Sequence, residues 1–393
     1  DEQEKGGKGM GLAILVYICS MAGIYIHIPF CRSKCFYCGF YSVASLQLKK
    51  EYVEALCREV ELRKNYLSAN QISTLYFGGG TPSCLEVEEL GAIVACVRKY
   101  WNLADDLEFS LEMNPEDAQK SKLLAFRNLG VNRLTIGVQS FNDDVLKRIN
   151  RTHSALQALE AVDVAKACGF DNIGIDLIIG LPGSTLQDLQ REIEIIKSLD
   201  ISHVSVYILS VDSNTVFEKL LEKGKFSPQD DDLLAEQYLF VSESLQQMSY
   251  EHYEISNFAK DSKYSRHNTS YWQQVPYLGI GAAAHSFDGG SRQWNVSHVK
   301  KYIDSLNNGD LIFEKEDLSD RDLFNEYLMT NFRTMWGIEP KFLEKAYPVW
   351  WRGIGSRLED YMKRGLMSWC GDKIRLTERG WLLSDGIFSE LFV

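Results

Sequence analysis

Three cysteines, Cys31, Cys35 and Cys38, lie within a span of eight residues. Thiolates are soft ligands, and three of them on one short loop suit an iron–sulfur cluster. A 4Fe–4S cluster normally takes four cysteines, so three local ligands leave one iron free to bind another molecule. The spacing therefore predicts a 4Fe–4S cluster that takes part in chemistry as well as in electron transfer.

Two other interpretations of these cysteines are open. They could belong to a zinc site with a distant fourth ligand, such as His27 or Cys84, or they could be unrelated buried thiols. Zinc-binding cysteines usually form two Cys-x2-Cys knuckles, and the chain has no second knuckle. The other six cysteines are scattered: Cys19, Cys57, Cys84, Cys96, Cys168 and Cys370. An odd total of nine in 393 residues is too sparse for a disulfide scaffold and predicts a cytoplasmic protein with reduced thiols.

Short apolar runs alternate with longer amphipathic runs after Met21, and the cysteine cluster directly follows the first short run. Six short runs are typical of buried strands: residues 24–28, 74–77, 107–113, 133–138, 172–178 and 203–208. Helical spacing of apolar residues lies between them, at residues 49–66, 86–100, 121–129, 155–168 and 186–199. Repeated strand-then-helix units predict parallel strands with right-handed crossovers. We therefore expect an α/β fold built on a partial (βα)6 barrel of TIM type.

Glycines or polar side chains follow the later strands as well. They are Gly78, Gly79, Gly80 and Thr81 after the second strand, Glu112, Gln139 and Asp176 at the next three, and Ser210 after the sixth. Each of these residues alone is typical of a cap or a tight turn. The carboxyl ends of parallel strands meet at one rim, so together they predict one shared ligand site beside the cysteines.

The length and the net charge limit the number of domains and the kinds of partner that the chain can have. At roughly 150 residues per domain, 393 residues allow one large domain and a smaller one. The net charge of −12 repels polyanions, which disfavours nucleic acid or an anionic membrane as the main partner. The nearly uncharged run at residues 10–28 ends as a strand, so we predict neither a membrane span nor a signal peptide there.

The predicted divisions are a leader or upstream extension outside the fold at 1–20, the partial barrel at 21–227, a connecting region at 228–298 and a C-terminal domain at 299–393. The connecting region should hold a helix at 231–248 and an irregular stretch at 252–281. The C-terminal domain should be mainly helical and winged-helix-like, ending in a helix at 355–364, a hairpin at 366–376 and a helix at 378–392. Acidic residues dilute the basic ones there, so a packing module is favoured over a DNA-binding one.

The Cys-x3-Cys-x2-Cys motif after the first barrel strand, with Tyr37 before its last cysteine, resembles that of the radical S-adenosylmethionine (SAM) superfamily. The resemblance implies that SAM binds the open iron and that one electron cleaves it to a 5′-deoxyadenosyl radical. From Met21 onward the chain also resembles the oxygen-independent coproporphyrinogen III dehydrogenase (oxidase-like) family, especially its haem-chaperone branch. The stretches that carry this resemblance are residues 24–31, 77–83, 111–116, 136–141 and 176–182.

Residue by residue, this resemblance implies SAM contacts from Tyr25, Gly79 and Glu112. In the dehydrogenase a second SAM molecule is contacted at further positions, which correspond here to Tyr37, Gly80, Thr81, Gln139, Arg151 and Asp176. All of those residue types are present in the chain. Whether a second SAM binds does not follow.

Two positions bear on the choice between enzyme and chaperone. Members that decarboxylate coproporphyrinogen carry a fourth cysteine where this chain has Phe40. Residues 266–272 resemble the His-Asn-x-x-Tyr-Trp signature of the haem-chaperone branch, which implies haem ligation by His267 with Tyr271 and Trp272 against the porphyrin. A structural hydrogen bond is the plainer role for one histidine beside aromatic residues. His285 also matches the family, with its role left open, and His27 is expected to be structural.

The leading hypothesis is a cytoplasmic protein that binds haem, a 4Fe–4S cluster and SAM, and that delivers haem to haem-dependent proteins, respiratory ones among them. The alternative is an oxygen-independent coproporphyrinogen III oxidase acting by radical oxidative decarboxylation. A third reading is a zinc-stabilised binding module, which the convergence of strand ends disfavours. The resemblance further implies a low-potential electron donor, and a homodimer is compatible with the sequence.

Overall fold

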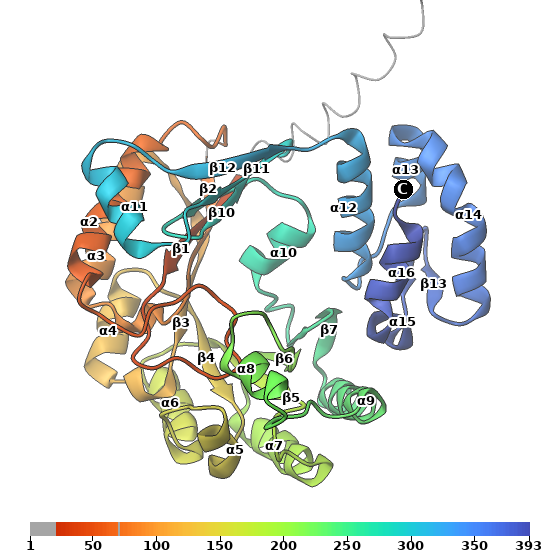
Figure 1. The fold of residues 1–393 in the computed structure, drawn as a ribbon, viewed down its shortest axis with the longest axis horizontal. Helices are drawn as coiled ribbons and strands as arrows, with labels where there is room; N and C mark the ends of the chain where they lie inside the picture. The colour runs from red at the N-terminus through yellow and green to blue at the C-terminus, as the bar shows by residue number, and fades with distance from the viewer. Residues whose placement is uncertain (1–20, 70) are drawn as a thin grey trace, which may run out of the picture.

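Six parallel strands in chain order form the centre of the protein. The computed structural model describes residues 21–69 and 71–393, so the predicted leader at 1–20 lies outside the described residues. The central strands are β1 (Met21–Ile28), β2 (Gln71–Gly79), β3 (Leu103–Met113), β4 (Arg133–Gln139), β5 (Asn172–Ile179) and β6 (His203–Ile208). Each pairs in parallel with the next, which confirms the predicted α/β architecture. The curved sheet does not close on itself (Figure 1).

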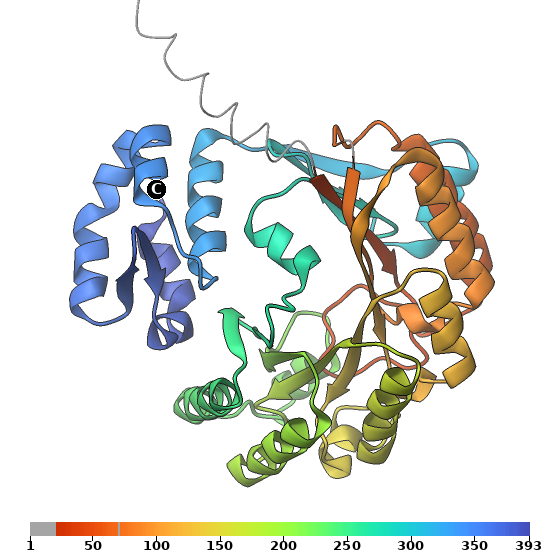
Figure 2. The same ribbon diagram turned by 180° about the vertical axis from the view of Figure 1, so that it is seen from behind.

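Helices connect these strands across the outer face of the sheet (Figures 1 and 2). They are α2 (Lys49–Leu62), α3 (Val87–Tyr100), α4 (Lys120–Asn128), α5 (Asp143–Arg148), α6 (Ala155–Ala167) and α7 (Leu186–Leu199), with 3-10 turns η1 (Pro82–Cys84) and η2 (Pro115–Asp117). Capping boxes begin α6 at Ser154 and α7 at Thr185, where each side chain accepts a backbone N–H of the first turn. The outer helices leave the inner face and the carboxyl rim of the sheet to the site.

Further strands extend the sheet at both edges, and this corrects the predicted irregular stretch at 252–281. They are β7 (Glu251–Glu254), β8 (Asn257–Ala259), β9 (Tyr277–Ile280), β10 (His285–Phe287), β11 (Ser291–Asn295) and β12 (Phe313–Asp317). β9 pairs in parallel with β1, and β8 pairs antiparallel with β6, giving twelve strands in all. Strands of three to five residues are too short to show a periodicity, and their partners lie far away in the sequence.

The other helices of the middle region are α8 (Val216–Glu222), α9 (Asp231–Gln247), α10 (Arg266–Trp272) and α11 (Val299–Asn307). The predicted helix at 231–248 is confirmed as α9. Helix α10 lies on the inner side of the sheet, between β2 and the C-terminal helices (Figure 1). α11 packs on α2 and β12 pairs with β11, while the predicted divisions at 228 and 299 stay predictions.

The C-terminal part has its own apolar core. It contains α12 (Asp320–Phe332), α13 (Pro340–Ala346), α14 (Pro348–Lys363), β13 (Met367–Cys370), β14 (Lys373–Leu376), α15 (Glu378–Leu382) and α16 (Ser384–Leu391). The hairpin is confirmed as β13–β14, and the helix predicted at 355–364 is the second half of α14. The single helix predicted at 378–392 is wrong, because the chain breaks at Leu383, which is 52% exposed. No helix in residues 21–69 or 71–393 combines the length and apolarity needed to cross a membrane.

Candidate functional site

The cysteine loop is held from several sides. At its start, the Cys31 N–H donates to the Val43 carbonyl over 3.0 Å. In its middle, the Phe36 N–H donates to the Ile149 carbonyl over 3.1 Å. The ring of Phe36 also packs edge-on against Phe217, with centroids 6.3 Å apart. The loop is therefore fixed by backbone bonds and by a small apolar cluster, although it contains no regular secondary structure.

A cavity of about 370 Å³ opens beside this loop at the carboxyl rim of the six strands. It brings together most of the predicted site residues: Cys31, Cys35, Tyr37, Cys38, Gly79, Gly80, Thr81, Glu112, Gln139, Arg151, Asp176 and Ser210. Phe40 also lines it and is 70% exposed. The convergence of strand ends expected from the sequence is thus present. Of the predicted site residues, Tyr25, Gly78 and His267 do not line this cavity.

The surroundings of Cys31 and Cys38 raise the pKa of both thiols. Burial raises the pKa of Cys38 to about 11. Burial also raises the pKa of Cys31, against hydrogen bonds from Thr81 and Ser42 that lower it. The Thr81 hydroxyl lies 3.5 Å from the Cys31 sulfur, and the Arg151 guanidinium 3.6 Å from the Cys35 sulfur. Since metal ligation requires thiolates, assembly of a cluster here must release protons.

The glycines after β2 are required by close packing. Gly79 has a φ of +112°, and a Cβ there would lie 2.5 Å from the His27 ring. A Cβ on Gly80 would lie 2.9 Å from the carbonyl oxygens of Ile28 and Phe30. The turn therefore brings its backbone against β1 and the start of the cysteine loop, where a larger residue would displace both.

Two half-buried carboxyl groups, those of Glu112 and Asp176, face the cavity from β3 and β5. Glu112 accepts hydrogen bonds from the Tyr76 hydroxyl at 2.7 Å and the Gly79 N–H at 3.0 Å. Burial raises its pKa to about 7, and the negative charge of Asp176 contributes to the shift. Burial likewise raises the pKa of Asp176 to about 6. Both groups would be stabilised as anions by a cationic ligand.

Several polar atoms in the cavity wall have no hydrogen-bond partner within the described part of the protein. Among residues 21–69 and 71–393, Gln139 Oε1, Arg151 Nε and Asp176 Oδ1 are buried without a hydrogen-bond partner. Gln139 has a φ of 65° beside a register shift between β4 and β5, which turns its side chain at the rim. Unpaired buried polar groups are costly unless a bound molecule satisfies them. The donors and acceptors therefore fit SAM, which carries a sulfonium, an ammonium, a carboxylate and ribose hydroxyls.

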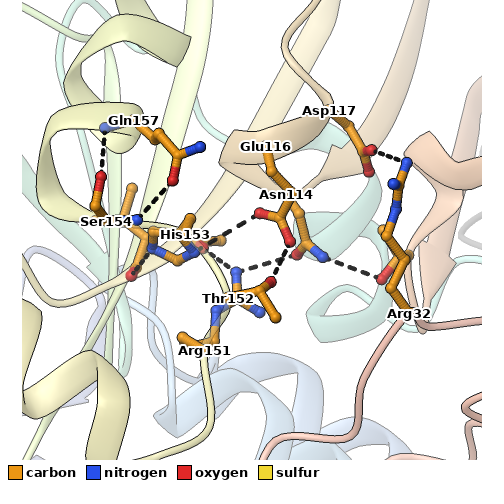
Figure 3. A network of polar contacts seen from close by, with 12 residues as sticks. Arg32, Asn114, Glu116, Asp117, Arg151, Thr152, His153, Ser154 and Gln157 are labelled. Atoms are coloured by element: carbon orange, nitrogen blue, oxygen red, sulfur yellow. Dashed lines mark hydrogen bonds and ion pairs between the residues drawn. The ribbon is translucent and has the colours of Figure 1, made fainter.

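Sequence reasoning missed a polar network that supports the cavity, which Figure 3 shows from close by. Asn114 joins two walls, because its amide donates to Thr81 over 3.4 Å and its oxygen accepts from Arg151 over 3.1 Å. Asp117 accepts from Arg32 and from the Ser83 hydroxyl, each over 2.7 Å. The sequence does contain a signal for this network, since Asn114 comes two residues after the strand-end residue Glu112 and directly before a proline.

The zinc alternative lacks its proposed fourth ligand. In the described ranges, no group of three or more His, Cys, Asp or Glu side chains is placed to hold one metal ion. His27 is engaged at both nitrogens, by the Tyr25 hydroxyl at 2.9 Å and the Tyr41 carbonyl at 3.0 Å. Cys84 is buried, and burial raises its pKa to about 12. A 4Fe–4S cluster, in contrast, binds each thiolate to a different iron and does not need the sulfurs to meet at one point.

Tyr25 and His267 meet inside the barrel, beneath the cavity. His267 is 1% exposed, and its Nδ1 and Nε2 pair with the hydroxyls of Thr74 at 2.7 Å and Tyr271 at 2.8 Å. Its ring stacks on Tyr76 with centroids 5.0 Å apart and lies 6.3 Å from Tyr25. Burial lowers the pKa of His267 to about 3. The structure thus describes His267 in the structural role, and haem ligation by it stays a prediction.

Comparisons with known proteins agree with this geometry. The sequence model of the radical SAM superfamily matches residues 25–222. The chain is 36% identical to the protein named heme chaperone HemW of Bacillus subtilis, over 94% of this chain and 98% of that protein. It is 34% identical to the HemW of Mycobacterium tuberculosis, over 94% of each chain.

Among solved structures, coproporphyrinogen III oxidase (HemN) from Escherichia coli, a radical SAM enzyme, has a TM-score of 0.81 at 22% identity. The likeness covers 97% of this chain and 93% of that chain, and at this identity it shows the fold alone. Superfamily membership implies a 4Fe–4S cluster and SAM, for which the cavity supplies thiols and polar contacts. The chain belongs to the radical SAM superfamily and, within it, to the HemW family.

Proposed function

We propose that the protein binds haem and delivers it to haem-dependent proteins, with SAM and a 4Fe–4S cluster in the cavity at the strand ends. The observation that carries this proposal is the match to proteins named haem chaperones, which spans 94% of this chain. Phe40, at the position of the decarboxylating members' fourth cysteine, supports a role other than porphyrinogen decarboxylation.

The chain's own residues have distinct tasks in this proposal. Cys31, Cys35 and Cys38 would hold the cluster on the loop that Val43 and Ile149 fix. Glu112 and Asp176 would offset the positive charge of SAM, and the backbone at Gly79 would approach it closely. When bound and reduced, the cluster supplies one electron for cleavage of SAM.

Tyr25 is connected to the cofactor cavity only indirectly, because its ring stacks on Tyr76, whose hydroxyl donates to Glu112 in the cavity wall. The resemblance assigns Tyr25 a direct SAM contact, which we retain as a proposal. The second SAM molecule, expected at Tyr37, Gly80, Thr81, Gln139, Arg151 and Asp176, is likewise retained, because all six residues line the same cavity.

The proposed haem ligand, His267, would have to leave both hydroxyl partners before iron could bind. The proposal also includes haem-accepting partners, respiratory proteins among them, and a low-potential electron donor. The eight cysteines of the described residues are all free, which supports a reducing compartment such as the cytoplasm. Homodimerisation stays a prediction.

Haem titration followed by absorption spectroscopy tests the proposal, with turnover of coproporphyrinogen measured on the same preparation. We expect stoichiometric haem binding without decarboxylation. His267→Ala would change the Soret band if His267 is the ligand, whereas an unchanged band would leave it a structural residue. Absence of haem binding together with decarboxylation would overturn the chaperone function.

A further inference from the structure

Two cysteines outside the cysteine loop lie opposite each other on neighbouring helices. Cys57 stands in the middle of α2, and Cys96 stands in the second half of α3. These helices lie side by side on the outer face of the barrel (Figures 1 and 2). Both thiols are free and half-buried. Small molecules in solution can therefore reach a pair of thiols at a helix–helix contact.

The register of the two helices brings these cysteines level. Both helices run in the same direction, because each connects one parallel strand to the next. Near their starts, the Lys49 ammonium lies 2.9 Å from a carboxylate oxygen of Glu89. Cys57 comes eight residues after Lys49, and Cys96 comes seven residues after Glu89. At about 1.5 Å per residue, both cysteines lie roughly 10–12 Å further along the helix pair.

The two sulfur atoms are in contact across the helices. The Cys57 sulfur lies 3.8 Å from the carbonyl oxygen of Ala92, which stands one turn before Cys96 on α3. The thiols of Cys57 and Cys96 are also hydrogen-bonded to each other. Rotation about the side-chain torsions can bring sulfurs in such contact to the disulfide bond length of about 2.05 Å. The helices themselves do not need to move apart or slide.

The two thiols differ in their surroundings. Burial, together with the neighbouring Cys96 thiol, raises the pKa of Cys57 to about 12. Cys57 therefore keeps its proton at neutral pH. Lys99 follows Cys96 by one turn on α3, and its positive charge interacts with the Cys96 sulfur. Because the thiolate is the attacking species in disulfide exchange, Cys96 should react first and Cys57 second.

This pair is separate from the cofactor site. Neither Cys57 nor Cys96 lines the cavity at the strand ends. Helix α2 follows the cysteine loop along the chain, and α3 follows the glycine turn after β2. A bond between the two helices would therefore join the elements that follow two walls of the cofactor cavity, without entering the cavity itself.

We propose that Cys57 and Cys96 form a reversible disulfide by exchange with a small disulfide of the glutathione type. The Cys96 thiolate attacks one sulfur of glutathione disulfide, so that a mixed disulfide forms and one glutathione leaves. The Cys57 sulfur then attacks Cys96 and displaces the second glutathione. Two electrons pass from the protein to the oxidant, and the two thiol protons end on the two glutathiones.

The disulfide should stabilise the barrel and leave the cofactor cavity open. It would close a loop of 40 residues, from Cys57 to Cys96. A cross-link of this kind typically lowers the unfolding equilibrium constant by roughly 30- to 850-fold, chiefly by restricting the unfolded chain. The affinity for SAM should stay the same, because the pair lies outside the cavity.

The test uses the full-length protein with its cluster assembled, so that the loop cysteines are ligated. The protein is equilibrated without oxygen in buffers of increasing glutathione disulfide content, and the remaining free thiols are then alkylated. Peptide mapping without reductant should show Cys57 linked to Cys96, in a fraction that rises with the disulfide content. The urea midpoint of unfolding should rise with the same fraction, and added dithiothreitol should reverse both changes.

Substitutions test the order of the two steps. Cys57→Ser should accumulate a mixed disulfide of Cys96 with glutathione, whereas Cys96→Ser should leave Cys57 unmodified. Neither variant should show the rise in the urea midpoint. Cys370→Ser, which removes an exposed thiol on β13, is the matched control and should form the bond like the wild type.

The mapping of the wild-type protein decides the matter without any substitution. Free Cys57 and Cys96 in the most oxidising buffer would overturn the proposal, and so would glutathione on both sulfurs with no linked peptide. A linked peptide with an unchanged urea midpoint would overturn the stabilising role. Haem takes no part in these measurements, so failure of the proposed function would not change their outcome.

Discussion

Replacing Glu112 with glutamine should weaken SAM binding and reduce its dependence on pH near neutrality. The carboxyl group lies in the wall of the cofactor cavity, where Tyr76 and Gly79 hold it in place. Burial and the nearby charge of Asp176 raise its pKa to about 7. At neutral pH, the free protein therefore holds Glu112 close to half ionised.

The sign and size of the effect follow from this pKa. A cationic ligand binds better to the ionised carboxylate, so binding releases a proton and affinity falls with falling pH. Kd should be level above about pH 8 and should rise as the pH falls through about 7, by up to about tenfold per pH unit from Glu112 alone, and Asp176 should add to the rise below about pH 6. Above pH 8 the charge-assisted contact is worth roughly 1.5–3 kcal/mol, so Glu112→Gln should raise Kd by roughly 10- to 150-fold.

Equilibrium dialysis of SAM against anaerobically reconstituted protein, across about pH 5.5–8.5, measures this dependence. Glu254→Gln is the matched control, because burial also raises the pKa of Glu254 to about 7 but this residue lies outside the cofactor cavity. The control should keep the wild-type profile. A Glu112→Gln protein with the wild-type affinity and slope would refute the reasoning.

Three other outcomes are expected. Cys35→Ser should abolish reductive cleavage of SAM but leave the binding of haem unchanged; retained cleavage would contradict the assignment of the cluster. Gly79→Ala should lower the free energy of unfolding by at least about 1–3 kcal/mol, because its Cβ would strike His27, whereas Gly289→Ala, also at positive φ but with open space around it, should cost less in thermal melts. For Glu254, a pKa raised by burial means stability that is present below the unfolded pKa and is lost as pH rises from about 4.5 to 7, by up to about 3 kcal/mol. Urea titrations should show a smaller loss over this range in Glu254→Gln than in the wild type, since Glu112 and Glu192 contribute to the loss in both proteins.

The barrel and the shared cavity could be predicted from the sequence because both depend on local patterns. Each central strand is a run of apolar residues bounded by turn residues, and parallel topology sends every strand end to one rim. The residues named from those ends, including Gly79, Glu112 and Asp176, do line one cavity.

Features set by distant pairing could not be predicted in the same way. β9 joins β1 only because Gly23–Ile26 and Tyr277–Ile280 meet in the folded chain. The orientation of α10 could not be predicted either. Contacts with distant segments decide whether His267 or Trp272 faces the inside of the barrel, since a short helix can turn either face inward.

Transfer of haem tests the central claim most directly. Protein loaded with haem is mixed with an apo-haemoprotein acceptor under anaerobic, reducing conditions, and the Soret spectra of both are followed while release of carbon dioxide from added coproporphyrinogen is measured. We predict that haem moves to the acceptor and that no carbon dioxide is released. A protein that holds no transferable haem but decarboxylates coproporphyrinogen would contradict the account.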